Sequence, residues 1–202
     1  MKWQGGRRSG NVQDRRGMSG GQKLTLGGVG GVIVLIVGLL FGGDPTELLN
    51  QMQQDQTGGA TSHTGTYEST PEEDKLLEFA GVVLASTEDV WGTIFKAQGQ
   101  QYPATKLTVY SGTEETGGCG TGQSSFGPFY CPGDQTIYLD LSFNKELTQK
   151  YGATGEFALA YVIAHEVGHH IQNIVGVLEK TNGLRAKMSE REYNKVSVMT
   201  EL

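Results

Sequence analysis

The clearest hydrophobic pattern in the chain lies between Glu156 and Val175, in the segment EFALAYVIAHEVGHHIQNIV. Its apolar residues recur at helical spacing, which predicts an amphipathic helix packed against a core. Thr154 or Gly155 precedes the segment, and Gly176 follows it as a natural C-terminal stop. This is the strongest helix that the sequence predicts.

Two further helices are predicted around this segment. Residues 71–98 carry apolar positions at helical spacing behind an acidic first turn, and a break is expected near Ser86 and Thr87. Residues 181–183 are expected to form a turn, and residues 185–202 a polar helix with few apolar anchors.

Two segments alternate polar and apolar residues, as strands do. They are Lys106 to Tyr110 (KLTVY) and Gln135 to Phe143 (QTIYLDLSF). One of them is expected to face the helix over residues 156–175. The pattern of helices and short strands predicts an α+β domain with a small sheet.

Residues 24–43 (LTLGGVGGVIVLIVGLLFGG) contain no charged side chain. As a helix they would span ~30 Å, about one hydrocarbon core, so they predict one transmembrane helix. The full length of the run and the following Asp44-Pro45 favour an uncleaved anchor over a signal peptide. A buried core helix is the alternative, but the glycines would weaken a soluble helix more. The Gly27 and Gly31 spacing would also permit a homodimer through the anchor.

The formal net charge of -6 conceals a strong asymmetry along the chain. Before residue 24 there is one acidic residue, Asp14, against six basic ones: Lys2, Arg7, Arg8, Arg15, Arg16 and Lys23. The positive-inside rule then predicts that residues 1–23 form a basic cytoplasmic tail and that everything after residue 43 is exported. We expect the inner membrane, with the acidic body in the periplasm or outside the cell. Anionic lipid explains the basic cluster, so no nucleic-acid partner is expected.

A chain of 202 residues has room for one domain of ordinary size with appendages. Residues 44–70 are rich in Gln, Thr, Gly and Ser and show almost no apolar periodicity, which predicts a flexible linker. His63 lies in this linker and is expected to be solvated. The folded domain is therefore assigned to residues 71–202.

Cys119 and Cys131 are the two cysteines of the chain. A pair that closes a short loop is stable in an oxidising compartment, so we predict a disulfide in the exported body. The alternative is zinc ligation by the thiolates. Neither cysteine lies in the CxxC spacing typical of such sites.

The predicted helix over residues 156–175 carries an HExxH motif formed by His165, Glu166 and His169. Residues four apart lie on one face of a helix, so both imidazoles can reach a single Zn²⁺ ion. Glu166 projects at the edge of that face, where it can act as general base toward zinc-activated water. An accidental match on a surface helix is the alternative, and the apolar surroundings of the motif argue against it.

The residues alone do not identify the third protein ligand of such a site. No histidine follows His170, so a carboxylate must complete the set. The candidates are Glu179, Glu190, Glu192 and Glu201, and a second, antiparallel helix would favour the later positions. His170 points about 100° away from His169 and is expected to support the site or face the substrate.

Four segments together resemble a bacterial family of single-anchor membrane proteins described as putative neutral zinc metallopeptidases. They are the opening MKWQGGRRSGNVQDRRG, the apolar anchor, CGTGQSSFGPFYCPGDQTIYLDLSF and AYVIAHEVGHHIQN. The resemblance implies a zincin-like domain in which Glu201, within NKVSVMTEL, is the third zinc ligand. The family continues beyond the position of Leu202, so the resemblance also implies a domain that is incomplete at its C-terminus.

The resemblance further suggests where a peptide substrate binds. In zincins an extended peptide pairs with the free edge of a strand above the motif helix. Residues 127–130 are expected to form that rim, or to be a structural loop packed by its aromatic side chains. Tyr130 or Tyr138 is a candidate donor to the oxyanion.

These observations predict a membrane-anchored zinc metallopeptidase with His165, His169 and Glu201 on the metal and Glu166 as general base. One alternative is a non-catalytic membrane-tethered module that binds a metal or a partner. Another is zinc-dependent hydrolysis of a bond other than a peptide bond.

Overall fold

The longest helix among the described residues begins at a capping box. The computed structural model describes residues 2–18, 67–153 and 155–201, and its helix α3 spans Pro71–Ala97. The Glu73 N–H donates to the Thr70 hydroxyl (3.2 Å), and the Thr70 N–H donates to the Glu73 carboxylate (2.8 Å). This reciprocal pair satisfies two backbone groups that a helix start otherwise leaves without partners.

Helix α3 continues through the position where the sequence suggests a break. The hydroxyls of Ser86 and Thr87 donate to the carbonyls of Val82 (3.0 Å) and Leu84 (2.7 Å) within the same helix. Because these polar side chains find partners on the helix itself, they do not interrupt it.

Helix α5 (Glu156–Ile174) forms where the sequence predicts it, and α4 (Phe143–Tyr151) precedes it. Gly176 adopts φ 78°, a left-handed conformation that ends α5 and lets the chain turn into α6 (Val177–Leu184). The prediction of a turn at residues 181–183 is wrong, because these residues are part of α6. Helix α7 (Glu190–Glu201) starts after Ser189, whose N–H and hydroxyl both donate to Glu192.

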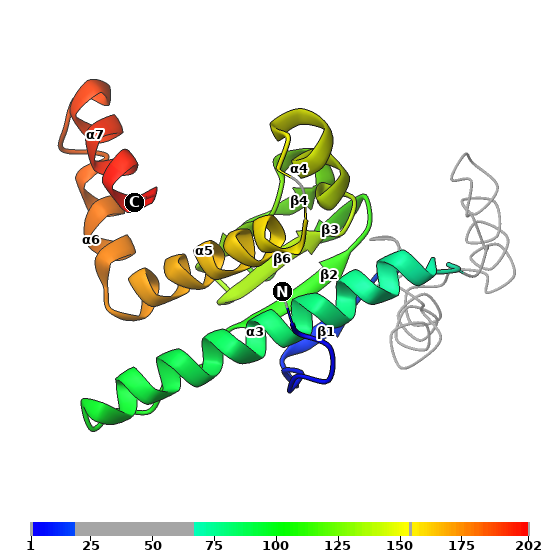
Figure 1. Cartoon of the computed structure of the whole chain (residues 1–202). Helices are drawn as coiled ribbons and strands as arrows, with labels where there is room; N and C mark the ends of the chain where they lie inside the picture. The colour runs from blue at the N-terminus through cyan, green and yellow to red at the C-terminus, as the bar shows by residue number, and fades with distance from the viewer. Residues whose placement is uncertain (1, 19–66, 154, 202) are drawn as a thin grey trace, which may run out of the picture. The chain divides into compact units, whose positions relative to one another are not determined.

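The main sheet has four strands in the order β1-β2-β6-β5. Its members are β1 (Val12–Asp14), β2 (Lys106–Tyr110), β5 (Phe129–Cys131) and β6 (Thr136–Asp140). β1, β2 and β6 (labelled in Figure 1) run parallel, and β5 pairs antiparallel with β6. A separate hairpin pairs β3 (Thr113–Glu115) with β4 (Thr121–Gln123). Both strands expected from the alternating patterns are therefore present, the second in shorter form.

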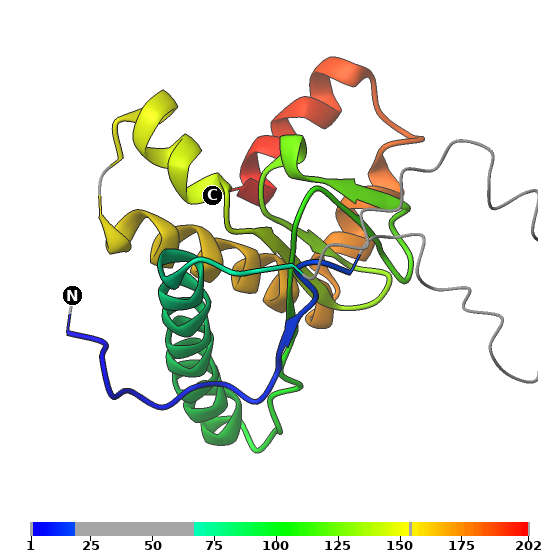
Figure 2. The same cartoon turned by 90° about the vertical axis from the view of Figure 1, so that its right-hand side faces the viewer.

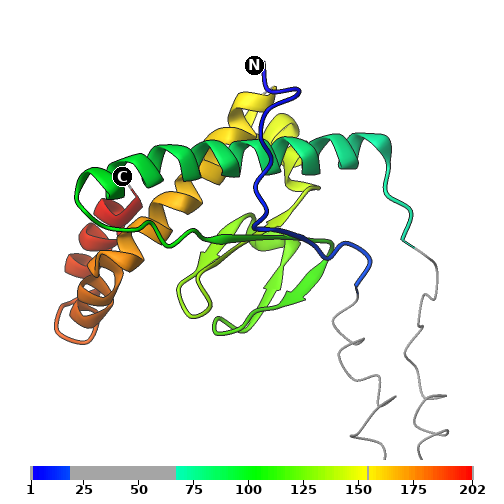
Figure 3. The same cartoon turned by 90° about the horizontal axis from the view of Figure 1, so that it is seen from below.

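Helices α3 and α5 lie side by side across one face of the main sheet (Figure 3). Between them and the strands lies an apolar core that includes Phe79, Leu84, Leu107, Val109, Ile137, Leu139, Leu159, Ile163 and Val167. The α+β prediction is confirmed. No helix within the described ranges is long and apolar enough to cross a membrane. The apolar run 24–43, its Gly27 and Gly31 contact and His63 lie outside those ranges.

The N-terminal segment belongs to this folded body. The Trp3 side chain is 5 % exposed, and its ring centroid lies 5.3 Å from that of Phe79 on α3. Residues Val12 to Asp14 pair with Leu107 to Val109, and Figure 2 shows the segment running past α3 to the sheet. Residues 2–18 therefore do not form the separate tail expected from the sequence.

The basic residues of this segment pair with carboxylates of the body. The pairs are Arg7 with Glu88 and Asp89, Arg8 with Glu78, Arg15 with Glu114, and Arg16 with Asp74 and with Asp14 of the segment itself. The charge asymmetry that suggests a cytoplasmic tail thus has another physical cause. A basic segment complements an acidic body.

Candidate metal centre

Two ligand candidates stand on one face of α5. The rings of His165 and His169 have centroids 4.6 Å apart and are inclined at 78°. Both side chains are partly exposed, while the apolar positions Leu159, Ile163 and Val167 on the opposite face are buried. Packing of the apolar face therefore turns the two imidazoles outward.

Glu201, in the last turn of α7, completes the cluster. Its Oε2 atom lies 3.2 Å from His165 Nε2 and 3.4 Å from His169 Nε2. One ligand atom from each of the three residues lies within 4.8 Å of the other two. Of the four glutamates that the sequence leaves open, Glu201 joins the histidines within the described part of the chain, whereas Glu179, Glu190 and Glu192 do not.

These spacings fit a tetrahedral metal ion. Donor atoms about 2.0–2.2 Å from a tetrahedral zinc lie roughly 3.3–3.6 Å from each other. The two distances to Glu201, 3.2 and 3.4 Å, are close to this range. Two imidazole nitrogens and one carboxylate oxygen are also a donor set typical of hydrolytic zinc, with the fourth position open to water or substrate. The donor set and these two distances therefore fit a zinc ion.

Glu166 is placed differently from the three ligand candidates. Its side chain is buried, 6 % exposed, on the side of α5 that faces β5. Burial raises the pKa of Glu166 to about 7, and the negative charge of Glu201 acts in the same direction. The charge of His169 and a hydrogen bond from the Tyr130 backbone N–H oppose this rise in pKa. A carboxyl group poised near neutrality can both accept and release a proton.

His170 is buried completely and does not face the substrate side. Its Nε2 lies 2.6 Å from the Pro103 carbonyl oxygen, and its Nδ1 lies 3.0 Å from the Tyr130 hydroxyl. Since a carbonyl only accepts, Nε2 carries the proton, and Nδ1 accepts from Tyr130. Burial lowers the pKa of His170, which favours the neutral ring. Of the two expected roles, support of the site agrees with this geometry.

Neither tyrosine proposed as an oxyanion donor has a hydroxyl aimed at the metal cluster. The Tyr130 hydroxyl donates to His170 and accepts from the Asn173 amide (2.9 Å). The Tyr138 hydroxyl donates to the Asp134 carboxylate at 2.7 Å. Both hydroxyls hold the sheet and its loops together.

Strand β5 carries one cysteine of the disulfide and also contacts the candidate base. Cys131 at its end bonds to Cys119, with an S–S distance of 2.04 Å and a Cα–Cα distance of 5.9 Å. The predicted bridge is present in the structure. β5 is an edge strand of the main sheet, and Tyr130 at its centre donates its backbone N–H to Glu166.

Gln172 is a site residue that the sequence analysis misses. Its Oε1 lies 3.0 Å from His169 Nδ1, and its Nε2 donates to the Thr200 carbonyl at 2.7 Å. Spacing of three residues on a helix places Gln172 near His169, which is the only signal in the sequence. Its contact with α7 depends on how the chain folds back.

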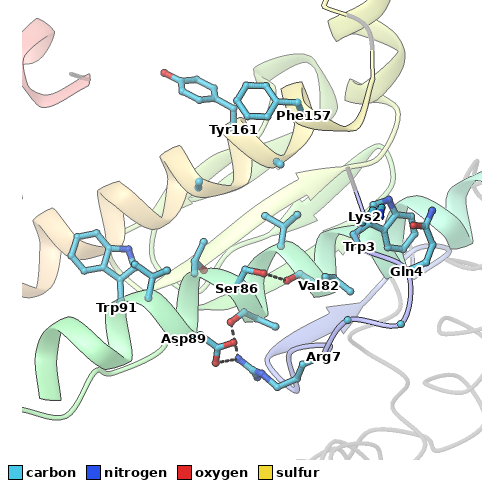
Figure 4. Close-up of a pocket in the computed structure, with 18 residues that line it drawn as sticks. Lys2, Trp3, Gln4, Arg7, Val82, Ser86, Asp89, Trp91, Phe157 and Tyr161 are labelled. Carbon is cyan, nitrogen blue, oxygen red and sulfur yellow. Dashed lines mark hydrogen bonds and ion pairs between the residues drawn. The ribbon is translucent and has the colours of Figure 1, made fainter.

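Open space lies on both sides of the metal cluster. A cavity of about 290 Å³ is lined by Tyr161, Ala164 and the three ligand candidates, and another of about 250 Å³ lies between Tyr130, His169 and α7. Tyr161 and Ala164 also line a larger apolar cavity of about 850 Å³ between α3, α5 and the N-terminal segment. Figure 4 shows Phe157 and Tyr161 on α5, with Val82 and Trp91 on α3. The cluster is accessible to a ligand of extended shape.

Comparison with known proteins finds related sequences. All of residues 1–202 match the family described as "Putative neutral zinc metallopeptidase". The uncharacterized protein YpfJ of Escherichia coli K12 is 45 % identical over 209 residues, which cover 100 % of this chain and 71 % of YpfJ. The uncharacterized protein Rv2575 of Mycobacterium tuberculosis H37Rv is 43 % identical over 94 residues, 46 % of this chain and 30 % of Rv2575. No solved structure matches. The chain therefore belongs to the putative neutral zinc metallopeptidase family.

Proposed function

We propose that this protein is a zinc-dependent peptidase with a zincin-like site. The observation that carries the proposal is the cluster itself: Glu201 Oε2 lies 3.2 and 3.4 Å from the Nε2 atoms of His165 and His169. Glu166, next to the first ligand in sequence, supplies a buried carboxyl group beside the cluster. In this assignment His165, His169 and Glu201 hold Zn²⁺.

Zinc bound at such a centre polarises a substrate carbonyl and makes water acidic enough to lose a proton near neutral pH. Glu166 has the role of general base that accepts this proton. A carboxyl group with a pKa of about 7 in the metal-free protein can then return the proton to the leaving amine. The result is hydrolysis of an amide without a covalent enzyme intermediate.

A peptide is the substrate class that the surroundings of the cluster favour. Strand β5 is an edge strand beside the cluster. The Tyr130 N–H donates to Glu166, and the rest of the backbone edge of β5 is where an extended peptide would pair independently of its side chains. The cavities on both sides of the cluster leave room for residues before and after the scissile bond. Both features suit a polypeptide better than a compact small molecule.

The test is metal content and hydrolysis measured on the full chain in detergent. The wild type is expected to bind one zinc per chain and to cleave an unstructured protein such as casein. Glu166→Gln is expected to keep the zinc, and its rate of hydrolysis is expected to be about 10²–10⁴-fold lower than that of the wild type. Hydrolysis unchanged in Glu166→Gln would contradict the assigned base. Zinc binding without any hydrolysis by the wild type would favour the metal-binding module instead.

We further propose that residues 24–43 attach the protein to a membrane with both flanking parts on the same side. The parallel pairing of β1 with β2 supports this, because residues 12–14 and 107–109 exchange hydrogen bonds. The Cys119–Cys131 bridge supports an exported, oxidising location. Gln4→Cys and Glu115→Cys, both at exposed positions, are expected to react with a membrane-impermeant maleimide from the same side in intact cells. Labelling of the two positions from opposite sides would overturn this proposal.

A further inference from the structure

The side-chain amide of Gln172 joins the two helices that supply the ligand candidates. Its Oε1 lies 3.0 Å from Nδ1 of His169 on α5, and its Nε2 donates to the carbonyl of Thr200 on α7 at 2.7 Å. Thr200 directly precedes Glu201. One amide thus contacts a ligand candidate on one helix and the backbone beside the ligand candidate on the other.

The Thr200 carbonyl determines which way the amide points. A carbonyl oxygen only accepts hydrogen bonds, so the NH₂ group of Gln172 must face it, and Oε1 must face His169. Oε1 in turn only accepts, so His169 carries its proton on Nδ1. The unprotonated nitrogen is then Nε2, the atom that lies 3.4 Å from Glu201 and that a metal would use.

The same contact helps to hold α7 against α5. Thr200 lies in α7 (Glu190–Glu201), and its carbonyl accepts from the Gln172 amide on α5 at 2.7 Å. No residue of α7 within the described range is buried, so apolar packing contributes little to the position of its last turn. The hydrogen bond to the Thr200 carbonyl therefore contributes strongly to the position of Glu201.

We propose that Gln172 is a positioning residue for the zinc site, acting on two ligands at once. It holds His169 in the tautomer with a free Nε2, and it holds the last turn of α7 so that Glu201 reaches the same point. This inference rests on the proposed function, in which His165, His169 and Glu201 bind zinc.

The experiment measures zinc affinity of the full chain in detergent by competition with a fluorescent chelator. Gln172→Ala is expected to weaken zinc binding about 10- to 100-fold, as loss of a residue that supports a metal ligand typically does. Gln172→Asn keeps the amide but is too short to span both partners, so it is expected to behave like the alanine variant. Gln149→Ala, on the exposed surface of α4, is the matched control and should leave the affinity unchanged.

A double-mutant cycle with Glu201→Ala tests the coupling between the helices. If Gln172 acts partly through Glu201, the loss caused by Gln172→Ala must be smaller in the Glu201→Ala background. Nitrogen NMR of the metal-free chain adds a readout independent of affinity: His169 should be protonated on Nδ1 in the wild type, and lose that preference in Gln172→Ala.

Each outcome separates this inference from the proposed function. If Glu201→Ala leaves the affinity of the wild type unchanged, the ligand set is wrong. If Glu201→Ala weakens binding while Gln172→Ala and Gln172→Asn do not, the ligand set stands and the role of Gln172 is overturned. Equal losses from Gln172→Ala in both backgrounds would also overturn the coupling.

Discussion

Helices α5 and α7 both supply ligand candidates, but the fold holds them very differently. α5 packs Leu159, Ile163 and Val167 into the core, and each is at most 1 % exposed. α7 contributes no buried residue within the described range. The side chain of His169 is 16 % exposed, whereas that of Glu201 is 59 % exposed.

This difference shows that one part of the candidate site is held by core packing and the other part by contacts at the surface. Two ligand candidates and the candidate base lie on a helix that packs into the core, so they are in place whenever the domain is folded. The third ligand candidate, Glu201, depends on a few polar contacts at the surface, such as the one between Gln172 and Thr200. Zinc affinity is therefore expected to respond to changes in α7 that leave the stability of the domain untouched.

The largest expected effect concerns the ligands themselves. His169→Ala should weaken zinc binding by more than the roughly 100-fold typical of losing a supporting residue. Glu201→Ala should cost less, because part of its binding energy is spent on ordering the end of α7. Chelator competition on both variants measures this order. A larger loss in Glu201→Ala would show that α7 is as well positioned as α5.

The second prediction compares the packing of the two helices. Leu159→Ala is expected to lower the free energy of unfolding by about 2–5 kcal/mol, because it opens a cavity in the core. Val198→Ala on α7, at a position 59 % exposed, should change it by less than about 0.5 kcal/mol. Urea unfolding of the metal-free protein gives both values. Similar losses at the two positions would contradict the contrast between the helices.

The third prediction uses the buried carboxyl group of α5. The pKa of Glu166 is raised by burial from 4.5 to about 7, so between these pH values the folded state keeps a proton that the unfolded state releases. Stability of the metal-free protein should then fall as the pH rises from 4.5 to 7, by at most about 1.4 kcal/mol per pH unit. Glu166→Gln should remove this fall.

The comparison with Glu166→Gln isolates that group. Burial lowers the pKa of His170, so the titration of His170 has the opposite effect to that of Glu166. It reduces the stability of the folded state as the pH falls below 6.5. Its contribution is common to both proteins and cancels in the difference. Identical pH profiles of unfolding for the two proteins would mean that Glu166 is not held in a desolvating environment.

The smallest expected effect is on local opening. Amide hydrogens in α7 should exchange with solvent faster than those at the core positions of α5, because fewer buried contacts oppose opening. Zinc should slow exchange in the last turn of α7 more than in α5. Hydrogen exchange followed by mass spectrometry with and without zinc checks this. Equal protection by zinc in both helices would indicate that α7 is already fixed without the metal.

Local sequence patterns determined much of the secondary structure of this protein and part of its candidate site. The HExxH spacing places His165 and His169 on one helical face, and the apolar residues of the same helix bury the opposite face, as the sequence predicts. The disulfide between Cys119 and Cys131 and the strand at Lys106 to Tyr110 also follow from the sequence. Each of these features depends on residues close together in the chain.

Tertiary structure decided the features that join distant parts of the chain. The family resemblance pointed to Glu201, but the residues alone did not select it among four glutamates. It is 36 positions from His165 and reaches the histidines through the reversal at Gly176 and the packing of α6 and α7. The strand Val12 to Asp14 is three residues long and has one apolar residue, so its own pattern is too short to predict that it pairs with β2. The physical reason is the same in both cases. These contacts form only when two distant segments meet, so the sequence of either segment alone does not indicate their free energy.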